Sequence, residues 1–136
     1  MSNPLIGKKV VSVDMPVDKL ALRFNLEGGE SIFALTDAEC CSSTWIESVE
    51  SPENLIGTVV AVEDIAMPEP VYDKAAFDCL EFYGCKITTE KGSCLIDYRN
   101  ESNGYYGGSL VWPREHDHGE VFWRSVHESG WKEIAK

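Results

Sequence analysis

The sequence has little positive charge and no long apolar run. It contains 12 lysines and arginines against 23 aspartates and glutamates, which gives a net charge of -11 at pH 7. Duplex nucleic acids are bound by basic faces that neutralise phosphates, so we expect no nucleic-acid duplex as a partner. No apolar stretch approaches the roughly 18 residues of a membrane-spanning helix, and segment 1–4 lacks the basic and apolar parts of a secretion signal. We therefore expect a soluble, cytoplasmic protein without a membrane partner.

Motifs for catalysis and metal binding are also scarce. The 5 cysteines include no Cys-x-x-Cys pair, and the sequence has no glycine-rich phosphate loop and no serine nucleophile elbow. Cys79, Cys85 and Cys94 lie in strand-like stretches, where a thiol acts as a small apolar side chain, so we expect them to be buried. Glu63 and Asp64 are adjacent and would point to opposite faces of a strand, so they do not converge as a catalytic pair. The sequence predicts no metal, no cofactor and no enzymatic activity.

Two alternatives stay open. Cys79 with Cys85, and His116 with His118, have the spacing closest to that of zinc ligands. Cys41 would become a nucleophile if the fold placed it beside a histidine such as His116, so a small enzyme that uses Cys41 or a histidine is a third functional hypothesis.

Most of the chain alternates between apolar and polar residues, which is typical of β-strands. The 136 residues suit one domain, and we expect a single β-rich domain over residues 1–136. Segment 20–26 alternates clearly, segment 27–30 reads EGGE, and segment 31–35 resumes the strand pattern, which predicts a hairpin. The fold class is therefore all-β or β-dominated α+β, built from antiparallel hairpins with one or two short helical turns.

The remaining elements are predicted from the same pattern. Segments 79–89, 93–99 and 105–112 should form a three-stranded meander, and segment 59–65 a buried strand. In an earlier strand, Val11, Val13 and Met15 should share one face. Ser51 and Pro52 favour a short helical turn with Ser51 as its N-cap. Segment 68–78 resembles a linker, segment 130–136 is expected to form at most a frayed helical turn, and the tail 113–136 is otherwise left unplaced.

A short motif occurs twice. Segments 5–7 and 55–57 both read LIG, and each precedes a valine-rich strand. Either the two motifs are equivalent strand starts at the same end of one sheet, or the match arose by chance.

Three segments together indicate a family. Segment 37–47 reads DAECCSSTWIE, segment 55–57 reads LIG, and segment 100–107 reads NESNGYYG. In this order and spacing they resemble a family of small, largely uncharacterised phage and bacterial proteins classed as a domain of unknown function. The resemblance covers about residues 5–112. It implies a compact β-rich domain in a phage or prophage setting, and it supplies no catalytic residues.

The same segments contain the candidate binding residues. Arg99, Asn100 and Asn103 would supply hydrogen-bond donors beside Tyr105 or Tyr106, one of which could stack on a base. The two further candidates are Arg23, as a partner of Arg99 across the sheet, and Trp45, as an aromatic surface. Each of these features also has a purely structural explanation. Segment 100–107 would be a hairpin whose two tyrosines fix the strand register. Segment 37–45 would be a capped turn, and Trp45 would lie in the core.

Three functions are compatible with these features. The first is a non-enzymatic phage-type protein that sequesters a small nucleotide signalling molecule of a host defence system. The second is an inhibitor that binds a host protein through its acidic surface. The third is the small enzyme named above. Because a β-rich chain with four tryptophans has sheet edges to protect, we also expect a homo-oligomer.

Overall fold

The computed structural model describes residues 3–38, 42–73, 78–102, 107–113 and 130–136. These residues form β-strands and one 3-10 turn, and every strand pair is antiparallel. The elements are β1 (Lys9–Pro16), β2 (Ala21–Leu26), β3 (Ser31–Ala38), β4 (Ser43–Glu50), η1 (Pro52–Leu55), β5 (Gly57–Ile65), β6 (Val71–Asp73), β7 (Asp78–Thr89), β8 (Gly92–Ser102), β9 (Gly108–Val111) and β10 (Trp131–Ala135). The predicted β-dominated fold is confirmed. The only helical element in the described part of the chain is η1, which has four residues, so no helix there is long enough to span a membrane.

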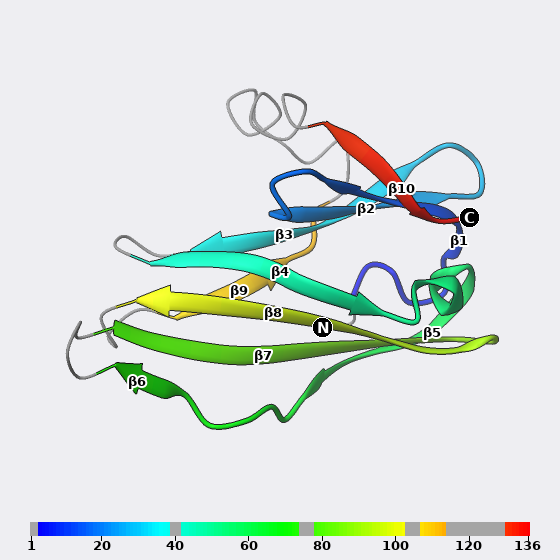
Figure 1. Cartoon of the computed structure of the whole chain (residues 1–136). Helices are drawn as coiled ribbons and strands as arrows, with labels where there is room; N and C mark the ends of the chain where they lie inside the picture. Colours follow the sequence, from blue (N-terminus) through cyan, green and yellow to red (C-terminus); the bar gives the residue numbers. More distant parts are fainter. Residues whose placement is uncertain (1–2, 39–41, 74–77, 103–106, 114–129) are drawn as a thin grey trace.

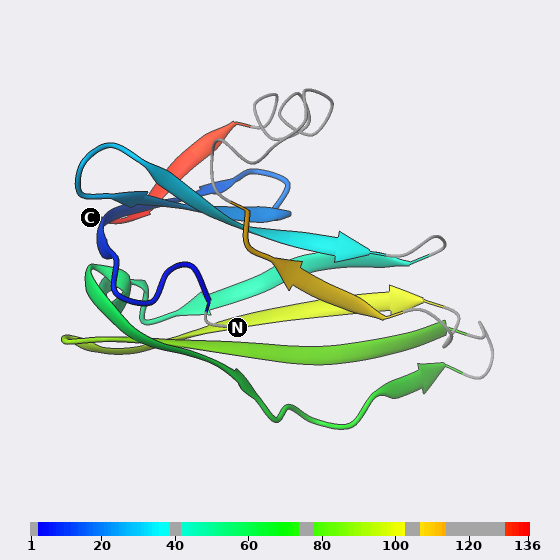
Figure 2. The same cartoon turned by 180° about the vertical axis from the view of Figure 1, so that it is seen from behind.

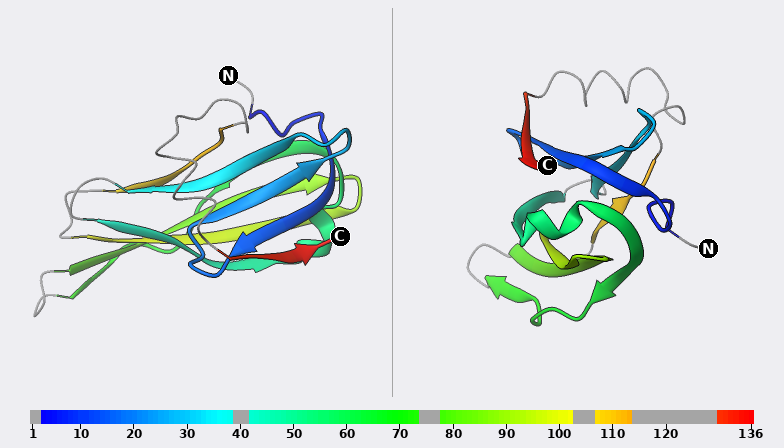
Figure 3. Two further views of the ribbon diagram at one scale, coloured as in Figure 1. Left: turned by 90° about the horizontal axis from the view of Figure 1, so that it is seen from above. Right: turned by 90° about the vertical axis from the view of Figure 1, so that its right-hand side faces the viewer.

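The strands form one ten-stranded sheet that folds into two layers. The order is β4-β8-β7-β5-β1-β2-β3-β9, with β10 paired to β1 and β6 paired to β7. Figures 1 and 3 show the first layer, made of β10, β1, β2 and β3, above a second layer of β4, β8, β7, β6 and most of β5. β9 pairs with β3 and slants from the first layer towards the second. The core lies between the layers, and its largest fully buried side chains include Phe24, Leu22 and Ile32 from the first layer and Ile46, Ile87 and Ile96 from the second.

The hairpin predicted for segment 20–35 is present. β2 and β3 pair from Ala21↔Leu35 to Asn25↔Ser31. Gly28 and Gly29 have φ values of 101° and 95°, which side chains with a Cβ rarely adopt, so the glycine pair makes this tight turn accessible.

The two Leu-Ile-Gly motifs are equivalent strand starts, as one of the two alternatives predicted. Leu5 and Leu55 are both fully buried. β1 and β5 pair only at their first residues, Lys9↔Thr58 and Val10↔Gly57. A register shift then follows in each strand, and β1 continues in the first layer while β5 continues in the second. The motifs therefore mark the point where the layers are joined.

The predicted meander is wrong in its third strand. β7 and β8 form the expected hairpin, but β9 pairs with β3, from Leu35↔Val111 to Ala38↔Gly108. β8 lies between β7 and β4, so it has no edge left for β9. The alternation in sequence identified the strands but contains no information about which distant strand is the neighbour.

Segment 130–136 also differs from the prediction of a frayed helical turn. Trp131–Ala135 is strand β10, which pairs with β1 from Val13↔Ala135 to Pro16↔Trp131. The Trp131 ring packs edge-on against Phe33, with ring centroids 6.0 Å apart. Pairing and packing with distant residues thus override the weak local pattern.

Three local predictions need correction. Ser51 is the N-cap residue of η1, but its side chain makes no cap hydrogen bond, because the backbone is left-handed there (φ 58°). Val11 is 41% exposed while Val13 is fully buried, since the register shift between Val10 and Ser12 interrupts the alternation. The segment expected to be a linker contains the short edge strand β6.

Candidate functional site

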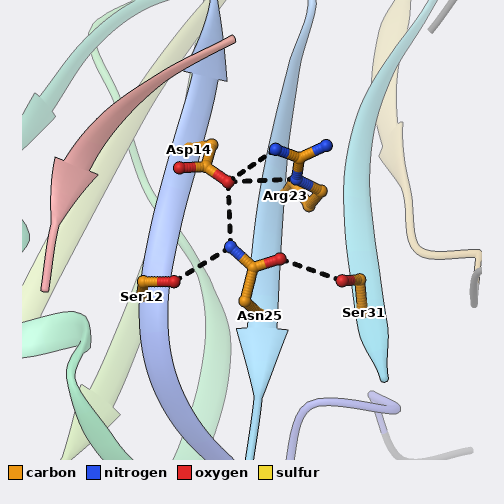
Figure 4. A network of polar contacts seen from close by, with 5 residues as sticks. All are labelled: Ser12, Asp14, Arg23, Asn25 and Ser31. Carbon is orange, nitrogen blue, oxygen red and sulfur yellow. Dashed lines mark hydrogen bonds and ion pairs between the residues drawn. The ribbon is translucent and has the colours of Figure 1, made fainter. Parts of the chain in front are cut away.

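Arg23 is part of a polar network on the outer face of the first layer. Its neighbours in sequence, Leu22 and Phe24, point into the core, so Arg23 points outward. Its Nε and Nη2 atoms donate hydrogen bonds to Oδ2 of Asp14 at 3.0 and 2.8 Å (Figure 4). Its guanidinium carbon lies 4.5 Å from the centre of the Trp131 ring. The Arg23 side chain is three-quarters buried, and its charge is neutralised by a carboxylate.

The same network ties three strands together. Asn25 on β2 donates to Oδ2 of Asp14 at 2.8 Å and to the Ser12 hydroxyl at 3.0 Å, both on β1 (Figure 4). The Ser31 hydroxyl on β3 donates to Oδ1 of Asn25 at 2.9 Å. One carboxylate oxygen therefore accepts three donors, which makes this cluster a structural connection between strands.

Arg99 and Trp45 lie on the opposite side of the molecule, on the outer face of the second layer. They are cross-strand neighbours on β8 and β4, and Phe82 on β7 is the other neighbour of Arg99. The Arg99 guanidinium lies 5.0 Å from the centre of the Phe82 ring. Glu47 at 3.7 Å and Asp97 at 3.5 Å supply negative charge. Arg99 therefore lies beside aromatic side chains of two neighbouring strands, but the tyrosines predicted beside it, Tyr105 and Tyr106, lie outside the described residues. Three strands separate β8 from β2, so Arg23 does not join this group.

Asn100 faces inward and belongs to a buried chain of hydrogen bonds. The Thr44 hydroxyl donates to Oδ1 of Asn100 at 2.8 Å, and Nδ2 of Asn100 donates to Oε1 of Glu81 at 3.3 Å. The Tyr83 hydroxyl donates to the other oxygen of Glu81 at 3.0 Å. Burial, followed by the hydrogen bond to Glu81, raises the pKa of Tyr83. Asn100 therefore connects β4, β8 and β7, and it does not lie beside Arg99 as a ligand donor.

The other candidates cannot be compared with this geometry. Asn103, Tyr105 and Tyr106 lie outside the described residues, as do Cys41 and the three histidines. Cys79, Cys85 and Cys94 are buried free thiols, as predicted. Among the described residues no group of three His, Cys, Asp or Glu side chains is placed to hold a metal ion.

A cleft that the sequence did not predict opens between the two layers, on the side where β5 and β9 lie. Figure 2 shows these two strands on the near side of the molecule. The cleft has a volume of about 260 Å³. Its described lining comprises Asn3, Val62, Glu63, Asp64, Cys85, Tyr98, Ser109, Leu110 and Trp112.

The chemistry of the cleft favours a positively charged group. Cys85 and Tyr98 line its inner part, and burial raises the pKa of each to about 12, with a further contribution from the Asp64 carboxylate. Both groups are therefore protonated and neutral at pH 7. Glu63 and Asp64 are the only charged side chains among the described lining residues. Apolar surface from Leu110 and Trp112 lies opposite this acidic strand edge.

The cleft exists because β5 is an edge strand over half its length. The sequence predicted segment 59–65 as a buried strand, but Val59 is its only buried residue and Val60 is 58% exposed. β5 turns away from β1 after Thr58, so its outer residues are covered by β7 on one edge only. Asp64 lies opposite the buried Cys85 and Glu63 opposite Lys86, so the two carboxylates do point to opposite faces, as expected.

A second hollow of about 350 Å³ is lined by Glu50, Ser51, Ile65, Lys86, Ser93, Cys94 and Leu95. It holds one carboxylate and one ammonium group, so its charge favours neither sign of ligand.

Comparison with protein families gives one match. The domain of unknown function DUF7448 matches residues 3–112. The chain belongs to this family. The matched region extends from Asn3 to Trp112, the first and last described lining residues of the cleft, and β10 lies beyond it. Neither the curated proteins nor the solved structures include one that matches the chain.

Proposed function

We propose that this DUF7448 protein is a non-enzymatic interaction protein that binds a basic segment of a partner protein in the cleft between β5 and β9. The observation that carries this proposal is the acidic lining of the cleft. Its described charged residues are Glu63 and Asp64, and Asp64 lies on the inner face of the layer, opposite the buried Cys85. A lysine or arginine side chain of the partner would lay its aliphatic stem along Leu110 and Trp112 and bring its charge to Asp64. The net charge of -11 would add long-range attraction for a basic partner.

The size of the cleft supports the same conclusion. Pockets that enclose drug-sized ligands have volumes of roughly 300–1,000 Å³. At about 260 Å³, this cleft accommodates one or two side chains of a partner more readily than a whole nucleotide.

Sequestration of a small nucleotide is the second candidate. The observation in its favour is the position of Arg99 between Trp45 and Phe82 on neighbouring strands, because a base could stack there beside a guanidinium group. A phosphate at Arg99 would compete with Glu47 and Asp97 for the same guanidinium. This competition places the nucleotide hypothesis second.

The setting of the interaction is part of the proposal. The segments DAECCSSTWIE and NESNGYYG resemble those of a family of phage and bacterial proteins. For a protein of phage or prophage origin, we propose that the partner is a host protein and that binding inhibits it. An inhibitor of this kind needs no catalytic residue.

Peptide binding tests the proposal. Fluorescence anisotropy would compare a labelled lysine-rich peptide with a glutamate-rich peptide of equal length, and we expect only the first to bind. Asp64→Asn should weaken binding about two- to fivefold, the range for a partly exposed ion pair. Glu133→Gln on β10, an exposed carboxylate outside the cleft, should leave binding unchanged. Equal effects of the two substitutions would show that net charge, not the cleft, attracts the peptide.

Calorimetry with nucleotides separates the second candidate from the first. If a nucleotide binds at Arg99, Arg99→Ala should weaken binding by about 1.5–3 kcal/mol, the range for a hydrogen bond to a charged group. Arg23→Ala should leave nucleotide binding unchanged, because Arg23 is held by Asp14 on the other layer. If the Arg99→Ala variant binds a nucleotide as tightly as the wild type, the protein binds nucleotides but not at Arg99. If no nucleotide binds to the wild type, nucleotide sequestration is wrong.

A further inference from the structure

Two strands that border the cleft each have one edge with which no other strand of the described chain pairs. Over Ala61–Ile65, β5 pairs with β7 on one edge, and within the described residues no strand pairs with its other edge. β9 pairs with β3, and its second edge is likewise without a strand partner in the described chain. Residues 62–64 of β5 and residues 109–110 of β9 line the same cleft, so the cleft lies between these two strands.

An unpaired strand edge presents a row of backbone N–H and C=O groups, and an extended peptide can satisfy them by adding as a further strand. We propose that the basic segment of the partner binds in this way, as an extra antiparallel or parallel strand along the edge of β5 formed by Ala61–Ile65. This inference rests on the proposed function, since it specifies how the same cleft holds its basic partner.

The edge residues define the sequence that would fit. Glu63 and Asp64 point to opposite faces of the second layer. A strand placed beside β5 meets one carboxylate on each face, and opposite charges on neighbouring strands stabilise a sheet. Adjacent residues of the added strand also point to opposite faces, so two consecutive basic residues would match this pair.

The residues flanking the carboxylates are apolar. Val62 and Ile65 lie on either side of Glu63 and Asp64, and both are half-buried. Cross-strand neighbours of these residues are best β-branched, because such side chains pack well on a pleated surface. The fitting segment is therefore a dibasic pair flanked by β-branched residues in an extended conformation.

Three peptides of equal charge test the inference by fluorescence anisotropy. The first has the sequence Thr-Val-Lys-Lys-Val-Thr, the second has the same sequence with alternate backbone nitrogens methylated, and the third, Lys-Val-Thr-Thr-Val-Lys, separates the lysines. We expect the first to bind at least about tenfold more tightly than the second, because N-methylation removes backbone donors and keeps every side chain. We also expect it to bind more tightly than the third. Hydrogen exchange of the amides in Ala61–Ile65 should slow when the first peptide is bound.

The outcomes distinguish this inference from the function on which it rests. If the methylated and unmodified peptides bind equally, or if the Ala61–Ile65 amides exchange at an unchanged rate, strand addition is wrong and a side-chain-mediated basic site remains. If no lysine-containing peptide binds, both proposals fail. In that case Glu63 and Asp64 act as charges that protect a sheet edge from association, a common role on edge strands.

Discussion

Removal of the Asp14 carboxylate is expected to destabilise the protein far more than removal of an exposed carboxylate from the same layer. Asp14→Ala deletes the acceptor of two hydrogen bonds from Arg23 and one from Asn25. It leaves a guanidinium group that is only 26% exposed without its counter-charge. Fully buried pairs cost about 3–5 kcal/mol when one partner is removed, and exposed pairs about 0.2–1 kcal/mol. The partial exposure of Arg23 places the expected loss at about 2 kcal/mol.

Urea titration of the wild type and the variant measures this loss as a change in the free energy of unfolding. Glu27→Ala is the matched control, because Glu27 pairs with Lys9 at 3.1 Å but both side chains are more than half exposed. Its expected cost is below about 1 kcal/mol. Arg23→Met, combined with Asp14→Ala, should cost less than the sum of the two single changes, since no unpaired charge is left behind. A loss below about 0.5 kcal/mol for Asp14→Ala, or additive costs in the double variant, would refute the assignment of a structural role to this network.

Four other features of the protein give measurable expectations. Gly108→Ala should lower the free energy of unfolding by about 1–3 kcal/mol, because a Cβ there would overlap the Thr44 hydroxyl, whereas at Gly130 a Cβ has ordinary contacts and alanine should be tolerated in the same urea titration. Cys85 and Cys94 should resist alkylation of the native protein at pH 7, as followed by mass spectrometry, because burial raises the pKa of each to about 12; rapid labelling of either would contradict their burial. Since these pKa values are raised in the folded state, the free energy of unfolding should fall as the pH rises from about 9 towards about 12, and Cys85→Ala should reduce that slope. Light scattering should give a mass above 15.2 kDa if the expected homo-oligomer forms, and a 15.2 kDa particle at all concentrations would show a monomer.

The fold was predictable to the extent that it depends on local pattern. Alternation and the glycine pair at Gly28 and Gly29 were sufficient for the β2–β3 hairpin. The doubled Leu-Ile-Gly motif left two alternatives open, and the structure shows the one in which β1 and β5 start side by side. Strand partners were not predictable, because β9 and β10 are short and each is fixed by a distant strand. Register shifts were also invisible, and the one in β1 reversed the expected burial of Val11.

Among the described candidates, Arg99 lies beside Trp45, whereas Arg23 and Asn100 lie apart from them for a related reason. Sequence proximity placed Arg99 and Asn100 in one site, but adjacent strand residues point to opposite faces, so one is on the surface and the other is in a buried network. Arg23 is held by its cross-strand neighbour Asp14, nine residues earlier, and the alternation of apolar and polar residues does not identify that neighbour. A pairing of β1 with β2, inferred from their short connection, was the available signal.

The cleft follows from the same strand divergence that builds the core. β1 and β5 must separate after their first residues, because each supplies one layer of the sandwich. On the β1 side the edge that opens is covered by β10, from Val13↔Ala135 to Pro16↔Trp131. On the β5 side the described chain supplies no equivalent strand, and this edge carries Glu63 and Asp64. This difference between two otherwise matching edges is the reason why we propose the β5 edge as the position for a strand of a partner, and its two carboxylates are the reason why we propose a basic one.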